Sequence, residues 1–274
     1  VAPILGCLQA VHKAAGHEAE PDLARRVLRA YRRERHAAGD RLRQAEPITV
    51  SDLRTLVDAI DRDVAAGRLP RLRGLRDHVA LVLGLTIAAR ASELAGLDIA
   101  DIDLREAEMV VTIRASKTDQ DARGKRLLIR QGQHPQTCPV RLTRAWLEAL
   151  AAQGITTGPL LRGLDRHGRL AGTPGYAGRR ARDGRPARIS EDALNALLRR
   201  AVDRARGHGA PLREPSAYSW HGLRAGYVTS AMQAGIPLDT IARFGRWQGS
   251  KTLLSVYWRE RLGGDDNLQQ RIGL

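Results

Sequence analysis

Apolar residues recur with a helical period along most of the chain. In Pro21–Arg35, Leu23, Val27 and Tyr31 stand four residues apart, so one helix face is apolar and the others are rich in arginine. Ser51 precedes a second apolar stripe, and we interpret it as the N-cap of a helix. Further helices are predicted over Leu72–Ala88, Val140–Gln153, Ser190–Arg206, His221–Gly235, Leu238–Phe244, Thr252–Arg259 and Asp266–Ile272.

Two short runs rich in β-branched and apolar residues interrupt this pattern. Met109–Arg114 and Arg126–Arg130 flank the polar segment Ala115–Lys125, an arrangement that predicts a β-hairpin. The fold class is therefore mainly α with a small antiparallel β-sheet (α+β). No internal repeat is apparent.

A polar stretch, His36–Glu46, separates two parts of the chain and predicts a linker before Pro47. We expect residues 1–45 to be a helical, basic piece plus this linker, and residues 46–274 to be one domain.

Charge adds a candidate class of partner to this picture. The 274 residues carry a formal charge of +15, and 41 of the 45 basic residues are arginines, which bind phosphate oxygens bidentately. Nucleic acid is thus the first candidate partner, and a GC-rich genome is the alternative explanation of the arginines.

Several functional classes find no support in the sequence. Cys7 and Cys138 cannot form a disulfide framework or a thiolate zinc site, which favours a reducing, cytoplasmic setting. The longest apolar run, near Val79–Ala89, is too short to span a bilayer, and no signal-peptide pattern opens the chain. Motifs for zinc proteases, P-loops and dinucleotide binding are missing, so we expect no metal and no cofactor.

The segment from residue 162 to residue 188 holds eight arginines among six glycines. This composition predicts a mobile basic loop that contacts DNA, and a surface insertion without function is the alternative. The candidate DNA-binding residues are Arg162, Arg166, Arg169, Arg179, Arg180, Arg182, Arg185 and Arg188.

A second set of residues, spread along the chain, fits the cleavage of a phosphodiester without a metal. Two arginines can hold the non-bridging oxygens, a tyrosine can form a covalent phosphoester, and a lysine or histidine can protonate the departing sugar oxygen. An indole N–H can add a further donor. The candidates are Arg90, Lys117, His221, Arg224, Trp247 and Tyr257.

The order and context of these residues resemble the tyrosine recombinase (phage integrase) family, particularly its Cre-like branch. ARASELAGLDIADID resembles the first-arginine box, HGLR the second box H-x-x-R, and GRW the G-H/W element, while Lys117 lies where the family keeps its hairpin lysine. Residues 46–274 are covered as the catalytic domain. Residues 1–45 resemble the end of the family's N-terminal core-binding (SAM-like) domain.

The resemblance assigns a role to each candidate. Arg90 and Arg224 are expected to clamp the scissile phosphate, and His221 to bind phosphate and assist proton transfer. Glu93, three residues after Arg90, fits the supporting carboxylate that orients the site.

The remaining three residues complete the expected reaction. Lys117 is the general acid toward the 5′ oxygen, Trp247 donates from its indole, and Tyr257 attacks to leave a 3′-phosphotyrosyl link. One departure is visible: ten residues separate Trp247 from Tyr257, where the family usually has nine. Gly249 can absorb the extra residue; otherwise Gln248 takes the slot of the tryptophan.

Four other tyrosines compete with Tyr257 as the nucleophile. Tyr218 and Tyr227 flank the second box and are the main rivals, Tyr176 lies in the basic loop, and we assign Tyr31 to a core. Only the position of Tyr257 after GRW favours it.

The resemblance further implies a site-specific recombinase or integrase that needs neither ATP nor metal. Its partners would be double-stranded DNA at specific sites and accessory DNA-bending proteins. It would be a monomer in solution and a homotetramer on DNA, with a Holliday junction intermediate, in a prokaryotic cytoplasm. A C-terminal helix carrying Leu268, Ile272 and Leu274 would dock on a neighbouring protomer or pack within its own. The alternatives are a type IB topoisomerase and a DNA-binding regulator without catalysis.

Overall fold

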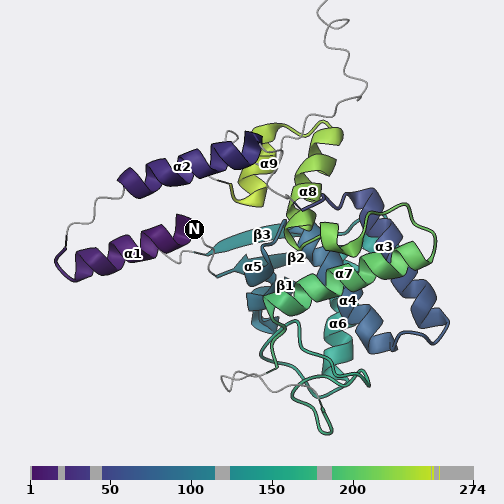
Figure 1. Ribbon diagram of the computed structural model, residues 1–274. Helices are drawn as coiled ribbons and strands as arrows, with labels where there is room; N and C mark the ends of the chain where they lie inside the picture. Colours follow the sequence, from purple (N-terminus) through teal and green to yellow (C-terminus); the bar gives the residue numbers. More distant parts are fainter. Residues whose placement is uncertain are drawn as a thin grey trace, which may run out of the picture. The chain divides into compact units, whose positions relative to one another are not determined.

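The computed structural model describes residues 2–17, 22–37, 45–114, 124–177, 187–247, 249 and 253. The chain divides into two compact units, residues 1–44 and residues 45–274. The first unit contains helices α1 (Ala2–Ala14) and α2 (Asp22–Ala37), so the helix predicted from Pro21 is confirmed (Figure 1). Tyr31 is 49% exposed, and its assignment to a core is wrong.

The second unit is built mainly from helices, and those predicted up to residue 245 are confirmed (Figure 1). A short helix after Ala89 was not predicted, because six residues are too few to display a period. The helices are α3 (Val50–Ala65), α4 (Arg71–Thr86), α5 (Ala91–Gly96), α6 (Pro139–Ala151), α7 (Glu191–Gly207), α8 (His221–Gln233) and α9 (Leu238–Gly245). Short 3₁₀ turns cover Ile99–Asp101, Pro135–Thr137 and Pro215–Ala217.

The first of these helices begins earlier than predicted. Thr49, not Ser51, is the N-cap of α3: its hydroxyl accepts a hydrogen bond from the backbone N–H of Asp52, and the Asp52 carboxylate accepts one from the N–H of Thr49. This reciprocal pair satisfies two N–H groups that would otherwise lack partners at the helix start.

A three-stranded antiparallel sheet lies beside the helices, in the order β1 (Ile102–Leu104), β2 (Glu108–Ile113) and β3 (Lys125–Arg130). The predicted hairpin is confirmed, with Val110 opposite Leu128 in its register. Strand β1 is only three residues long and shows no alternation that could predict it.

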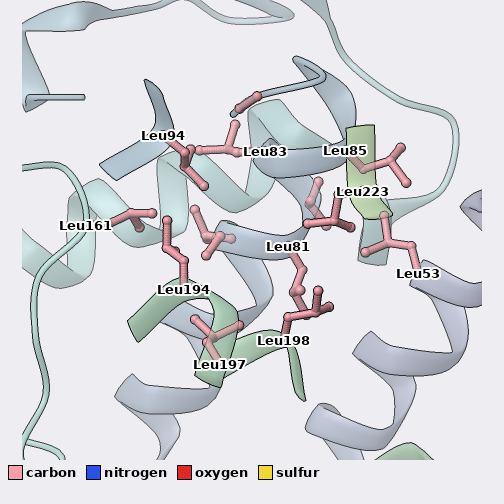
Figure 2. Close-up of a cluster of buried hydrophobic side chains, with 14 of the residues drawn as sticks. Leu53, Leu81, Leu83, Leu85, Leu94, Leu161, Leu194, Leu197, Leu198 and Leu223 are labelled. Atoms are coloured by element: carbon pink, nitrogen blue, oxygen red, sulfur yellow. The ribbon is translucent and has the colours of Figure 1, made fainter. Parts of the chain in front are cut away.

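The core forms where α3, α4 and α7 pack together. Leucines from these helices and from α5 and α8 meet in one cluster (Figure 2). Helix α4 is the centre of this packing: all its residues from Val79 to Leu85 are buried. The apolar run of the sequence is thus a central core helix, and no described helix has the length and apolar character needed to cross a bilayer.

The backbone just before α3 lies against α8 and fixes that helix. The N–H of Ile48 donates to the carbonyl of Gly222 at 2.9 Å, and the N–H of Val50 donates to the hydroxyl of Ser230 at 3.0 Å. A Cβ atom on Gly226 would lie 1.7 Å from the carbonyl oxygen of Ile48, so only glycine allows this approach. Residues 46–48, which we call the strap, therefore seat the helix that carries His221 and Arg224.

Candidate active site

The site is built around the turn that joins α4 to α5. Ala88 has a left-handed backbone conformation, with φ of 45°. The N–H of Ala89 donates to the carbonyl of Gly84 at 3.0 Å, which closes the turn. This conformation leaves the carbonyls of Ile87 and Ala88 to accept hydrogen bonds from arginine side chains.

Arg224, from the first turn of α8, reaches this turn from the other side of the site. Its guanidinium donates to the carbonyl of Ala88, and also to the carbonyl of Gly245 at 2.7 Å. Its residue exposure is 1%, and the indole ring of Trp247 covers its guanidinium. A Cβ atom on Gly245 would lie 1.6 Å from the Trp247 ring, so this glycine gives the ring its place.

Arg90 is the N-cap residue of α5. Its guanidinium pairs with the Glu93 carboxylate at 2.5 Å, and its backbone N–H donates to the other carboxylate oxygen at 3.0 Å. The Arg90 side chain is 24% exposed, so it can still meet a ligand. Glu93 thus contacts Arg90 with both carboxylate oxygens, and its role as the supporting carboxylate stays a prediction.

Glu93 is buried and serves two arginines. Its side chain is 1% exposed, and its second oxygen binds the guanidinium of Arg246 at 2.6 Å. Burial alone would raise the pKa of this carboxyl, but the charge of Arg246 and the hydrogen bonds from Arg90 outweigh burial and hold the pKa below its usual value. Glu93 is therefore a fixed negative charge under the candidate clamp.

Arg246 is the site residue that sequence reasoning missed, although it lies within GRW. It has a left-handed conformation at the end of α9, with φ of 62°, and it is 8% exposed. Besides Glu93 it binds the carbonyl of Ile87 at 2.9 Å and approaches that of Ala88 at 3.4 Å. Among 41 arginines, only its place between Gly245 and Trp247 could have suggested a special role.

His221 opens α8, three residues before Arg224. The two residues differ in exposure: His221 is exposed, and Arg224 is buried. The helix thus holds one residue in the interior of the site and offers the other at the surface.

Two candidate residues, Lys117 and Tyr257, lie outside the described residues, as does Gln248. The same applies to Leu268, Ile272 and Leu274 of the expected C-terminal helix. The described residue Lys125, at the start of β3, donates to the carbonyl of Arg243 in α9 at 3.0 Å, so this end of β3 contacts α9.

The two main rivals of Tyr257 as nucleophile, Tyr227 and Tyr218, lie in environments that disfavour ionisation of their hydroxyl groups. Burial raises the pKa of Tyr227 to about 12, and its ring stacks on Phe244 with centroids 5.7 Å apart. Burial also raises the pKa of Tyr218, whose hydroxyl accepts a hydrogen bond from the N–H of Arg213. Neither environment favours the phenolate that a nucleophile requires.

The basic segment is described at residues 162–177, 187 and 188. In these parts Leu164 pairs with Leu170 across a bridge and Arg162 pairs with Arg188, so they have defined backbone contacts. Arg162 is 7% exposed and donates to the carbonyls of Thr157 and Ala171, so its guanidinium is directed at the backbone of this chain.

Three other arginines of this segment are also described. Arg188 donates to the carbonyls of Ala95 and Leu97 and binds Asp98, which again fixes the segment to its surroundings. Arg166 is exposed, and Arg169, also exposed, donates to the carbonyl of Gly175. The candidates outside the described residues are Arg179, Arg180, Arg182 and Arg185.

Among the described residues, no three His, Cys, Asp or Glu side chains gather in a way that could hold a metal ion. The described part of the site offers guanidinium groups held by carbonyls and one carboxylate. Such a site can bind an anion through two guanidinium groups, because their fixed donors match phosphate oxygens.

Comparison with known proteins places this geometry in context. No family model matches the chain. A curated protein of Selenomonas ruminantium, "Integrase/recombinase xerD homolog", is 28% identical over 245 residues, which cover 88% of this chain and 62% of that protein. The chain therefore spans less than two thirds of this relative.

Solved structures share the fold at low sequence identity. The XerH site-specific recombinase bound to palindromic difH substrate in a post-cleavage complex superposes with a TM-score of 0.55 at 13% identity, covering 84% of this chain and 53% of that one. The XerA recombinase gives a TM-score of 0.51 at 14% identity, and the match covers 97% of this chain and 72% of the XerA chain. The sequence similarity and the shared fold together confirm the predicted resemblance of this chain to the tyrosine recombinase family.

Proposed function

We propose that this chain is a site-specific DNA recombinase or integrase that cuts and rejoins DNA through a covalent bond to Tyr257. The observation that carries the proposal is the convergence of Arg90 and Arg224 on one turn, with Glu93 fixing the first and the carbonyl of Ala88 fixing the second. Two guanidinium groups in fixed positions are what a metal-free phosphoryl transfer requires, since charge builds on the non-bridging oxygens.

The proposed cleavage step is a balanced exchange of two phosphoesters. The phenol oxygen of Tyr257 bonds to phosphorus, and the bond from phosphorus to the 5′ oxygen breaks. Lys117 supplies a proton to the departing 5′ oxygen, and the tyrosine proton passes to a base or to water, with His221 assisting. The product is a 3′-phosphotyrosine and a free 5′ hydroxyl, and the reverse of this step with another 5′ hydroxyl rejoins the strand.

The other groups support the phosphate during this exchange. Arg90 and Arg224 clamp the oxygens, and Trp247 donates from its indole N–H. Because the phosphotyrosine keeps the energy of the broken bond, the chemistry requires neither ATP nor a metal.

The proposed partner is double-stranded DNA at specific sites, bound by four copies of the chain, with a Holliday junction as the intermediate and DNA-bending proteins as possible accessories. Support comes from the solved relative XerH, whose structure is a post-cleavage complex with its difH substrate. The charge of +15 agrees with a polyanionic partner.

The test is a search for the covalent adduct with the full chain. A library of nicked duplexes with randomised arms is incubated with the protein, and SDS-resistant complexes are isolated, sequenced and mapped by mass spectrometry. We expect the adduct on Tyr257, loss of the adduct in Tyr257→Phe with DNA binding retained, and an unchanged adduct in the matched variant Tyr227→Phe.

Three results would contradict the proposal or part of it. Adduct from Tyr257→Phe would remove Tyr257 as the nucleophile. DNA binding without any adduct would identify a regulator. Relaxation of supercoiled plasmid without strand exchange between paired sites would identify a topoisomerase.

A further inference from the structure

Arg246 occupies a position that neither of the two clamp arginines could fill. It lies on the inner side of Glu93, with a guanidinium-to-carboxylate distance of 2.6 Å and side-chain exposures of 5% for Arg246 and 1% for Glu93. Arg90 binds the other oxygen of the same carboxylate from the exposed side. Glu93 is therefore held between a buried cation and a cation that faces the ligand.

The same guanidinium also fixes the turn on which the clamp depends. Arg246 binds the carbonyls of Ile87 and Ala88, and the Ala88 carbonyl is also an acceptor for Arg224. One side chain thus contacts the supports of both clamp arginines: the carboxylate of the first and the carbonyl of the second.

The local structure keeps Arg246 in this place at a cost. Its left-handed conformation is unfavourable for a residue with a Cβ atom, and its buried Nε has no hydrogen-bond partner. Burial also lowers the pKa of Arg246, although Glu93 partly offsets this effect. A side chain that served only to fill space would be better replaced by an apolar one.

We propose that Arg246 is a positioning residue of the strand-transfer site, which aligns Arg90 and Arg224 through Glu93 and the carbonyl of Ala88. The inference rests on the proposed function above and adds a component to it. Arg246 itself does not touch the DNA.

A role in alignment predicts a change with pH that a purely structural role does not. The charged groups that act on Glu93 are Arg90, at the N-cap of α5, and Arg246, after α9. Tyr227 on α8 acts in turn on Arg246, and Arg224 on α8 shares the Ala88 carbonyl with Arg246. Removing the charge of Arg246 leaves burial as the largest influence, so the pKa of Glu93 rises. Arg90 then loses its ionised partner as the pH falls, at a higher pH than in the parent protein.

The experiment compares Arg246→Gln, Arg246→Lys, Glu93→Gln and the double variant Arg246→Gln/Glu93→Gln in the full chain. The carboxyl carbon of Glu93 is titrated by ¹³C NMR, with its signal assigned by the loss in Glu93→Gln. The rate of adduct formation on the nicked library is measured from acid to neutral pH. Arg54→Gln, which removes one exposed arginine from α3, is the matched control for charge.

We expect Arg246→Gln to raise the pKa of Glu93, to slow adduct formation on the order of 100-fold, and to move the acid limb of the rate profile to higher pH. The shifted limb should be absent in the double variant. Arg246→Lys should keep the pKa of Glu93 low and recover part of the rate, because the charge remains while the fork of donors is lost.

Two results would overturn the inference. One is a slowed reaction with no change in the acid limb or in the NMR titration, which would reduce Arg246 to a packing role. The other is a raised pKa of Glu93 with an unchanged rate. Absence of adduct from the parent protein would instead contradict the proposed function, and the NMR titration would still decide whether Arg246 keeps Glu93 ionised.

Discussion

The guanidinium of Arg224 lies over the indole ring of Trp247, with the guanidinium carbon 3.9 Å from the ring centroid. This contact lies at the centre of the candidate site and buries a cation that also binds two backbone carbonyls. Cation–π contacts of this kind contribute about 2 kcal/mol when they are desolvated. Trp247 thus contacts Arg224 through its ring, and the proposed function gives it a second role, donation of the indole N–H to the phosphate.

Replacement of Trp247 separates these two roles. Trp247→Phe keeps an aromatic face but loses the N–H, so we expect a melting temperature close to the parent value and adduct formation about tenfold slower, since one charged hydrogen bond is lost. Trp247→Ala should lower both the melting temperature and the rate of adduct formation. Calorimetry and the adduct assay measure the two effects, and a Trp247→Phe protein that reacts at the parent rate would show that the indole proton is not used.

The basic segment contains arginines with different functions, which substitution can distinguish. Arg162→Ala leaves the buried carbonyls of Thr157 and Ala171 without a donor, so we expect a loss of roughly 1 to 3 kcal/mol of stability. The salt dependence of DNA binding should stay the same. Arg166→Ala, at an exposed position, should instead leave stability unchanged and reduce the salt slope by about one. A reduced slope in Arg162→Ala would contradict this division.

Asp63 connects α3 to α7 through an ionic contact that depends on pH. Its carboxylate accepts hydrogen bonds from Arg68, Arg204 and His208. Burial opposes ionisation of Asp63, but these three partners lower its pKa from 3.8 to about 2. Because the folded-state pKa is the lower one, the contact stabilises the protein above about pH 4 and this stabilisation is lost as the pH falls toward 2.

Asp63→Asn should consequently reduce stability at neutral pH by roughly 1 to 3 kcal/mol and flatten the acid side of the stability profile. Urea denaturation at a series of pH values measures both. Asp203→Asn, which removes an exposed carboxylate from the same helix α7, is the control and should change neither. An acid profile for Asp63→Asn parallel to that of the parent protein would exclude this contact as the cause.

The close contact between the strap and α8 predicts that alanine destabilises the protein at Gly226, whereas it is tolerated at Gly207, away from this contact. In Gly226→Ala the new Cβ atom would lie 1.7 Å from the carbonyl oxygen of Ile48, so the strap or the helix must shift, at a cost of about 1 to 3 kcal/mol or more. Gly207→Ala, at the end of α7, meets nothing within 4 Å and should be neutral or slightly stabilising. Thermal unfolding of both variants checks the pair, and equal melting temperatures would mean that the strap is not tightly seated.

The sequence predicted those parts of the molecule in which a local pattern determines the structure. The stripes of α3 and α7 and the H-x-x-R spacing of α8 are periodic over at least one helical turn, so the helices and the positions of His221 and Arg224 could be inferred. Glu93 was identified as a supporting carboxylate from the family resemblance, and its contact with Arg90 is likewise local, since three residues separate the two at a helix start.

Interactions between distant segments could not be predicted in this way. Arg246 pairs with Glu93, which lies 153 residues away, yet in the sequence it looks like the exposed arginines. Arg162, whose contacts are only five and nine residues away, gives no sign of its burial in the sequence either. An arginine side chain is long enough to reach water or to turn inward, and the backbone around it decides which occurs. Strand β1 and helix α5 were missed because they are shorter than the period needed to recognise them.

The carbonyl of Ala88 is an acceptor that mutation of a side chain cannot delete. Its position depends on the backbone conformation of Ala88, whose φ of 45° is a value that glycine adopts freely and that β-branched residues resist. Evolution at position 88 is therefore restricted by the shape of the residue and not by its chemistry. With glycine at position 88, Arg224 and Arg246 could keep their contacts with this carbonyl. Valine or isoleucine there would displace the carbonyl, although every proposed reacting group would remain in the sequence.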